Sequence, residues 1–170
     1  GIFTPNAHSK DAAVLVPIVN KQDGLHVIFT TRALHLRHHP GQISFPGGRR
    51  DDSDDSLIET ALREADEEIG LSPNNVSVLG WLPSLHTISN YTVYPLVGLI
   101  KEDRPFTINE DEVAEVFSAP LRHFLTRKSH TSIKPRRHGA SQTVHFMPYD
   151  DKLIWGATAA ILDKLASHFE

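Results

Sequence analysis

The chain contains no cysteine, and this absence excludes several kinds of site at once. A disulfide framework, a thiolate zinc site and a thiol nucleophile all require cysteine. No apolar run approaches the roughly 18 residues that span a bilayer, and residues 1–10 lack the apolar core of a signal peptide. We therefore expect a cytoplasmic protein that does not enter a membrane.

Positive charge is not in excess either. The formal net charge is −4, which argues against the broad basic surface that non-specific nucleic-acid binding needs. Hydrophobic residues make up 39% and charged residues 22% of the 170 residues, as in an ordinary packed domain. The sequence predicts one domain over residues 1–170, and it is compatible with a homodimer.

Apolar runs and turn residues indicate alternating strands and helices. Strands are predicted at Ala12–Val19, Leu25–Thr31, Val76–Leu82, Tyr91–Ile100, Val113–Phe117 and Thr143–Phe146. Helical segments are predicted at Ser56–Ile69, Pro120–Leu125 and Ala157–Phe169. Mixed strands with two good helices favour an α/β layered fold.

The helix predicted at Ser56–Ile69 carries its own start and stop signals. Ser56 can cap its N-terminus and Gly70 can end it. A core stripe is predicted at helical spacing, formed by Ile58, Leu62, Ala65 and Ile69. Arg32–Gly48, by contrast, is rich in His, Arg, Pro and Gly and is predicted as a long loop with a short extended piece at Ile43–Phe45. Loops of this length are usually functional.

Acidic residues gather at the wrong end of the predicted helix. Glu64, Glu67 and Glu68 lie near its C-terminus, where the helix dipole disfavours negative charge and where neighbouring carboxylates repel. Their spacing puts them on one face, and a divalent cation such as Mg²⁺ or Mn²⁺ would remove the penalty. Arg63 is one turn before Glu67 and can hold it in place. A solvated acidic face is the alternative interpretation.

Two motifs together resemble a known family. Gly48, Asp55, Arg63-Glu64-Ala65, Glu67-Glu68 and Gly70-Leu71 resemble the Nudix box, with Asp55 where the family usually has Glu and one extra residue before it. That insertion is similar to the coenzyme A pyrophosphatases. Their second signature is matched by Thr30-Thr31-Arg32-Ala33, Arg37, Gly41 and Phe45-Pro46-Gly47-Gly48, and Ile154–Ala159 is also similar. We call Arg32–Gly48 the signature loop.

The resemblance implies the Nudix fold, an α/β/α sandwich with a mixed central sheet. It also implies metal-dependent hydrolysis of coenzyme A to 3′,5′-ADP and 4′-phosphopantetheine. Glu64, Glu67 and Glu68 would hold Mg²⁺ or Mn²⁺, with Glu64 and Glu67 also serving in catalysis. The resemblance places a further catalytic acid on a later loop, where Glu112 is the first candidate and Glu115 the second.

Substrate contacts are expected from the signature loop and the residues after it. Arg32 and Arg37 suit the 3′-phosphate of coenzyme A, and Arg49 and Arg50 suit the pyrophosphate. Gly47 and Gly48 would let the backbone approach the phosphates closely. A solvated basic loop is the alternative for these arginines. The basic stretch Lys134–His138 offers a second, weaker candidate for phosphate contact.

The sequence is also compatible with other functions. ADP-ribose, NADH or a sugar nucleotide could replace coenzyme A as the substrate, and the fold could serve as a non-catalytic nucleotide-binding domain. RNA decapping is disfavoured because no basic stripe is evident. A zinc site at His35, His38 and His39 is disfavoured because these residues lack zinc-ligand spacing.

Overall fold

The computed structural model describes residues 10–87, 89–126, 130–133, 136–137, 140–141 and 144–169, with only the backbone at 136–137 and 140–141. Among these residues, eight strands form a central sheet in the order β3-β2-β1-β7-β5, with β4 paired to β1, β6 to β7 and β8 to β2. These strands are β1 Lys10–Lys21, β2 Gly24–Arg32, β3 Ile43–Ser44, β4 Gly47–Arg49, β5 Val76–Trp81, β6 Leu85–His86, β7 Tyr91–Ile100 and β8 Val113–Pro120.

The central sheet is mixed. Strand β1 runs parallel to β7, in register from Lys10 opposite Tyr91 to Ile18 opposite Leu99. The other pairings of β1, with β2 and with β4, are antiparallel. Strands β4 and β2 pair with different halves of β1, so the sheet splits beside its centre. This split is where the signature loop leaves and re-enters the sheet.

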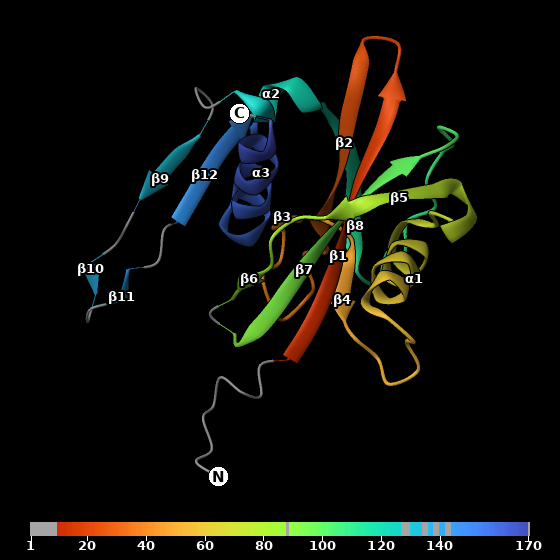
Figure 1. The fold of residues 1–170 in the computed structure, drawn as a ribbon, viewed down its shortest axis with the longest axis horizontal. Helices are drawn as coiled ribbons and strands as arrows, with labels where there is room; N and C mark the ends of the chain where they lie inside the picture. The colour runs from red at the N-terminus through yellow and green to blue at the C-terminus, as the bar shows by residue number, and fades with distance from the viewer. Residues whose placement is uncertain are drawn as a thin grey trace.

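Helices cover both faces of the central sheet (Figure 1). Helix α1 (Leu57–Ile69) packs on one face, and the short 3-10 helix η2 (Pro73–Asn75) follows it. Helices α2 (Leu121–Leu125) and α3 (Gly156–His168) lie together on the other face. The predicted α/β/α sandwich with a mixed central sheet is therefore confirmed.

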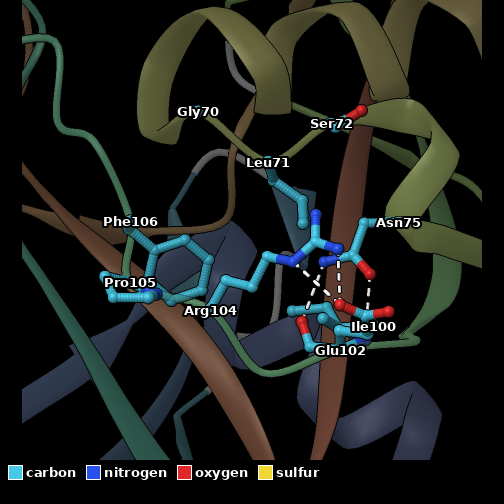
Figure 2. A pocket seen from close by; sticks show the side chains of 9 residues that line it. All are labelled: Gly70, Leu71, Ser72, Asn75, Ile100, Glu102, Arg104, Pro105 and Phe106. Carbon is cyan, nitrogen blue, oxygen red and sulfur yellow. Dashed lines mark hydrogen bonds and ion pairs between the residues drawn. The ribbon is translucent and has the colours of Figure 1, made fainter.

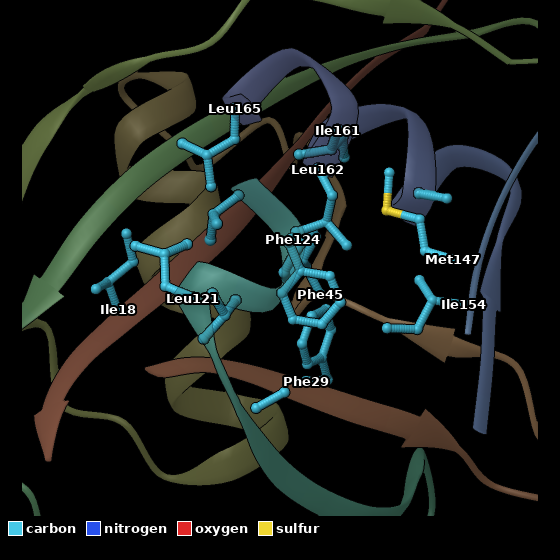
Figure 3. Close-up of a cluster of buried hydrophobic side chains, with 14 of the residues drawn as sticks. Ile18, Phe29, Phe45, Leu121, Phe124, Met147, Ile154, Ile161, Leu162 and Leu165 are labelled. Atoms are coloured by element: carbon cyan, nitrogen blue, oxygen red, sulfur yellow. The ribbon is translucent and has the colours of Figure 1, made fainter. Parts of the chain in front are cut away.

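Two apolar cores fill the layers. Ala13, Leu15 and Val19 of β1 pack toward α1, while Val16 and Ile18 pack toward α2 and α3. Because β1 is buried on both faces, its sequence is a continuous apolar run. The core beneath α3 is centred on aromatic rings, with Phe29 stacked on Phe45 at 5.2 Å between centroids (Figure 3).

A small second sheet lies outside α3. It consists of β9 (Thr131–Ile133), β12 (Val144–Tyr149) and β13 (Lys152–Trp155), in the order β13-β12-β9. Met147 and Ile154 of this sheet are fully buried in the α3 core. A separate pair of short strands is formed by β10 (Arg136–Arg137) and β11 (Ala140–Ser141). The predicted strand Thr143–Phe146 corresponds to β12, although Thr143 itself lies outside the described residues.

The structure corrects two predictions. Gly47 and Gly48 belong to strand β4 and not to a loop, because they pair with Val14 and Ala13 of β1. Ile58 is not a core residue, because it is 36% exposed. The buried face of α1 contains Thr60, Ala61, Ala65, Glu68 and Ile69, so two polar side chains occupy positions that the apolar stripe did not predict. Among the described residues, no helix combines the length and apolarity needed to cross a bilayer.

Candidate metal centre

Three carboxylates converge beside the split in the sheet. Glu64, Glu68 and Glu112 each place one oxygen within 4.8 Å of the other two. Glu68 is buried, Glu64 is half-buried and Glu112 is exposed, so the cluster opens to solvent on one side. Carboxylate oxygens are the ligands that Mg²⁺ and Mn²⁺ prefer, and the donor set therefore fits a hard divalent cation.

The ends of α1 fix where two of these acids point. The Ser56 side chain accepts a hydrogen bond from the Glu59 backbone N–H at 3.2 Å, and Gly70 ends the helix with φ of 68°. Glu64 and Glu68 are four residues apart and therefore share a helix face. The Gly47 backbone N–H donates to Glu68 Oε2 at 3.0 Å, which fastens this face to β4.

Gly47 and Gly48 are needed for close packing at this point. A Cβ on Gly47 would lie 2.5 Å from the carbonyl oxygen of Ala13. A Cβ on Gly48 would lie 2.8 Å from the carboxylate carbon of Glu64. The two glycines thus allow β4 to approach β1 and Glu64 to approach β4. Their predicted contact with substrate phosphates stays a prediction.

The cluster concentrates negative charge in a poorly solvated place. Burial raises the pKa of Glu68 to about 8, and the neighbouring charges of Glu64 and Glu112 add to the rise while the Gly47 N–H opposes it. Burial also raises the pKa of Glu64, against the opposing effect of Arg63. Both acids therefore resist ionisation until a cation compensates their charge.

Arg63 organises the cluster from the side, and its main partner is Asp54. Nε and Nη2 of Arg63 donate to the two Asp54 oxygens at 2.9 Å each. The Asp54 side chain is 1% exposed and also accepts bonds from Thr60 Oγ1 at 2.8 Å and the Asp51 N–H at 2.9 Å. These bonds, led by that from Arg63, hold the pKa of Asp54 well below its usual range.

Sequence reasoning missed Asp54. The motif placed Asp55 at the acidic position before the helix, but Asp55 is exposed, and its backbone N–H donates to Glu59 Oε2 at 2.8 Å. Spacing could not separate the two, because four acids lie between positions 51 and 55. Only burial distinguishes them, and burial depends on how the loop folds over Thr60 and Arg63.

Arg63 also contacts the acids of α1. Its Nη1 donates to Glu64 Oε1 at 3.0 Å and to Glu67 Oε1 at 3.3 Å. The Glu67 side chain is 53% exposed and is not one of the three converging carboxylates. The structure thus brings together Glu64, Glu68 and Glu112, with Glu67 beside them on Arg63.

Glu115, the second candidate for the catalytic acid, lies elsewhere. On β8, Val116 packs toward α1 whereas Phe117 packs toward α3. Glu115 is two residues before Phe117 on this strand, so its side chain points to the same face as Phe117 and away from the cluster. Its Oε1 accepts a bond from Lys152 Nζ at 2.9 Å. Of the two candidates, only Glu112 joins the cluster.

The predicted substrate-binding arginines differ in their surroundings. Arg32 is half-buried, and its Nε donates to the His38 carbonyl at 3.1 Å, which ties the signature loop together. Arg37 is exposed, and no described residue accepts a hydrogen bond from it. Arg49 is exposed, and Arg50 Nη2 donates to the Asp54 carbonyl at 3.3 Å. In the basic stretch at 134–138, residues 134, 135 and 138 lie outside the described residues, as do the side chains of 136 and 137.

A pocket at the C-terminal end of α1 is separate from this centre (Figure 2). Its wall includes Asn75, whose side chain exchanges two 2.8 Å hydrogen bonds with the backbone of Glu102. Arg104 pairs with the Glu102 carboxylate beside it. None of the predicted catalytic, metal-binding or substrate-binding residues lines this pocket.

Comparisons with known proteins identify the family. The NUDIX domain model matches residues 9–152. The Nudix hydrolase NudL of Escherichia coli O7:K1 is 44% identical over 158 residues, which cover 92% of this chain and 81% of that protein. NudL of Escherichia fergusonii shows the same identity and coverage.

Solved structures show the same fold. The NUDIX domain of Shewanella oneidensis NrtR, complexed with ADP ribose, aligns with a TM-score of 0.61 at 17% identity, covering 99% of this chain and 94% of that one. RenU, a Nudix hydrolase from M. smegmatis, aligns with a TM-score of 0.58 at 22% identity, covering 68% and 73%. Nudix hydrolases generally use divalent metal ions, and the acidic cluster is present here. The chain belongs to the NUDIX domain family and is a Nudix hydrolase, an enzyme that acts on a pyrophosphate bond.

Proposed function

We propose that the enzyme hydrolyses the diphosphate of coenzyme A or a derivative to 3′,5′-ADP and 4′-phosphopantetheine with Mg²⁺ or Mn²⁺. One observation carries the proposal. The signature loop that resembles the coenzyme A pyrophosphatases is bonded directly to the residue that completes the acidic cluster, because the Ala33 N–H donates to the Glu112 carbonyl at 3.0 Å. The sequence signature and the candidate metal centre therefore belong to one site.

The carboxylates of this site would hold the cation. Glu64, Glu68 and Glu112 supply converging oxygens, and Glu67 supplies a further carboxylate at the rim. A bound divalent cation neutralises phosphoryl oxygens and lowers the pKa of a bound water. Arg63 keeps Glu64 and Glu67 in place through bonds of 3.0 and 3.3 Å.

Exposed side chains are proposed to transfer the proton and to orient the substrate. Glu112 is the exposed member of the cluster, and this exposure supports a role for it as the acceptor of the proton of the attacking water. The exposed Arg37 is free to meet the 3′-phosphate, whereas Arg32 shapes the loop that carries it. Arg49 is the last residue of β4 and Arg50 follows it, and both are proposed to face the pyrophosphate.

Product analysis tests the proposal. Coenzyme A would be incubated with Mg²⁺ or Mn²⁺ and the wild-type, Glu67→Gln, Glu68→Gln or Asp66→Asn protein, and the products identified by mass spectrometry. We expect 3′,5′-ADP and 4′-phosphopantetheine from the wild type, and a rate lower by about 10²–10⁴ in Glu68→Gln. The Glu67→Gln variant should likewise lose most of the activity. Asp66 is exposed on the same helix turn, so Asp66→Asn should retain wild-type activity.

The same assay separates the competing substrates. Hydrolysis of ADP-ribose, NADH or a sugar nucleotide about ten-fold faster than coenzyme A would reject the proposed substrate while retaining the enzyme class. Nucleotide binding without metal-dependent turnover would instead indicate a non-catalytic domain.

The 3′-phosphate provides a sharper test of Arg37. A charge-assisted bond to this phosphate should be lost in Arg37→Ala, which should lower kcat/KM for coenzyme A by about 10- to 100-fold. The variant should hydrolyse 3′-dephospho-coenzyme A as the wild type does, because that substrate lacks the group. An equal loss with both substrates would remove Arg37 from 3′-phosphate recognition.

A further inference from the structure

Glu112 is the one member of the acidic cluster that is not on α1, so the turn before β8 must deliver it. Two backbone bonds attach this turn to the end of α1. The Asn109 N–H donates to the Glu68 carbonyl at 2.9 Å, and the Thr107 N–H donates to the Ile69 carbonyl at 3.0 Å. Carbonyls in the last turn of a helix have no partner within the helix, so they are available for this attachment.

Asn109 closes the turn from within. Its Oδ1 accepts the Asp111 N–H at 3.1 Å. Its carbonyl accepts the Glu112 N–H at 3.1 Å and the Val113 N–H at 2.9 Å. An Asn side chain bonded to the backbone two residues later is a stable turn former. One side of the turn is thus fixed to the helix that carries Glu64 and Glu68.

The signature loop fixes the other side. The Ala33 N–H donates to the Glu112 carbonyl at 3.0 Å. Nε2 of His35 lies 3.0 Å from the Asp111 carbonyl, across 76 residues of sequence. A carbonyl can only accept, so Nε2 must carry the hydrogen in this contact. Asp111 and Glu112 are therefore held on both sides, and His35 is the side chain that does so from the signature loop.

We propose that His35 is a positioning residue that holds Glu112 against Glu64 and Glu68. The inference rests on the proposed function only in taking this cluster as the cation site. In this role His35 couples the signature loop to the metal centre, because a displacement of the loop at His35 moves the turn that carries Glu112. His35 itself touches neither the cation nor the substrate in this role.

Titration calorimetry with MnCl₂, without nucleotide, tests the proposal. We expect His35→Ala to weaken Mn²⁺ binding by about three- to ten-fold, as the loss of one hydrogen bond predicts. His35→Gln retains an N–H donor and should recover most of the affinity. His38→Ala is the matched control, because His38 is an exposed histidine of the same loop and no described residue bonds to its ring. Unchanged Mn²⁺ affinity in His35→Ala would overturn the proposal.

A double-mutant cycle distinguishes positioning from general support of the fold. If His35 acts through Glu112, His35→Ala should have no further effect on Mn²⁺ affinity in a Glu112→Gln background. An equal loss in both backgrounds would overturn the proposal. Should His35→Ala not fold, Asn109→Ala weakens the same turn from inside and must show the same dependence on Glu112. Because these titrations contain no coenzyme A, their outcome does not depend on whether coenzyme A is the substrate.

Discussion

At the residue scale, the position of one buried acid decides how the centre is held. Asp54 and Asp55 are neighbours with the same side chain. Asp54 accepts hydrogen bonds from Nε and Nη2 of Arg63, whereas Asp55 is exposed. Arg63 in turn contacts Glu64 and Glu67. Asp54 therefore affects the cluster indirectly, because it orients the Arg63 guanidinium group that contacts Glu64 and Glu67.

Removing the Asp54 charge should destabilise the protein severely. Asp54→Asn removes the main, buried counter-ion of the partly buried Arg63, and we expect the free energy of unfolding to fall by about 3–5 kcal/mol. Urea denaturation of the metal-free protein measures this change. The control Asp55→Asn should stay within about 0.5 kcal/mol of the wild type, as exposed substitutions usually do. Similar losses in both variants would contradict the assignment of Asp54 as the partner of Arg63.

Glu68 should make the stability of the metal-free protein depend on pH. Its pKa is about 8 in the folded protein and near the ordinary value of 4.5 when unfolded. Between these values the folded state binds the extra proton, so the free energy of unfolding should fall as pH rises from about 4.5 to 8. Denaturation curves across this range should show a smaller slope for Glu68→Gln. Identical slopes would contradict the inferred burial penalty.

At the element scale, strand β4 makes room for α1. Gly48→Ala would place a Cβ against the flexible end of Glu64, whereas Gly47→Ala would press against the backbone of Ala13. We expect Gly48→Ala to weaken Mn²⁺ binding with little loss of stability. Gly47→Ala should lower the melting temperature, because its clash cannot be relieved by a side-chain movement. Calorimetry and thermal denaturation of the two variants measure the contrast, and it fails if both variants behave alike.

Helix α1 shows which features can be predicted from the sequence and which cannot. Ser56, Gly70 and the span of α1 follow from local capping rules, and the structure confirms them. The prediction of the buried face of α1 was partly wrong, because Ile58 is exposed while Thr60 and Glu68 are buried. Polar burial there depends on Asp54 and Gly47, which approach α1 from other segments. Strand β7 was predicted with its observed bounds because its apolar run is continuous and flanked by turn residues.

At the scale of the whole molecule, the centre depends on contacts between distant segments. Glu112 reaches Glu64 and Glu68 because β8 pairs with β2, which ends beside the split in the sheet. The family resemblance implied that a later loop would contribute an acid, with Glu112 as the first candidate and Glu115 as the second. The structure shows that Glu115 points away from the cluster, and the direction of its side chain is fixed only by the register of β8 with β2.

Cation binding should stabilise the entire fold. A ligand that binds only the folded state at about 100 times its Kd adds about 2.7 kcal/mol to the free energy of unfolding. For a chain of this size, that corresponds to a rise in Tm of about 5–10 °C. Thermal denaturation with MnCl₂ should show this rise in the wild type and in Asp66→Asn, and EDTA should abolish it. The rise should be absent in Glu68→Gln, and its survival there would place the cation elsewhere.

The most direct measurement is anomalous diffraction from a crystal of the wild-type protein soaked in MnCl₂. We expect an anomalous peak between the carboxylates of Glu64, Glu68 and Glu112, at a bonding distance of about 2.0–2.2 Å from oxygens of at least two of them. A manganese peak confined to the acids at positions 51–55, or no peak at all with the three carboxylates turned apart, would contradict it.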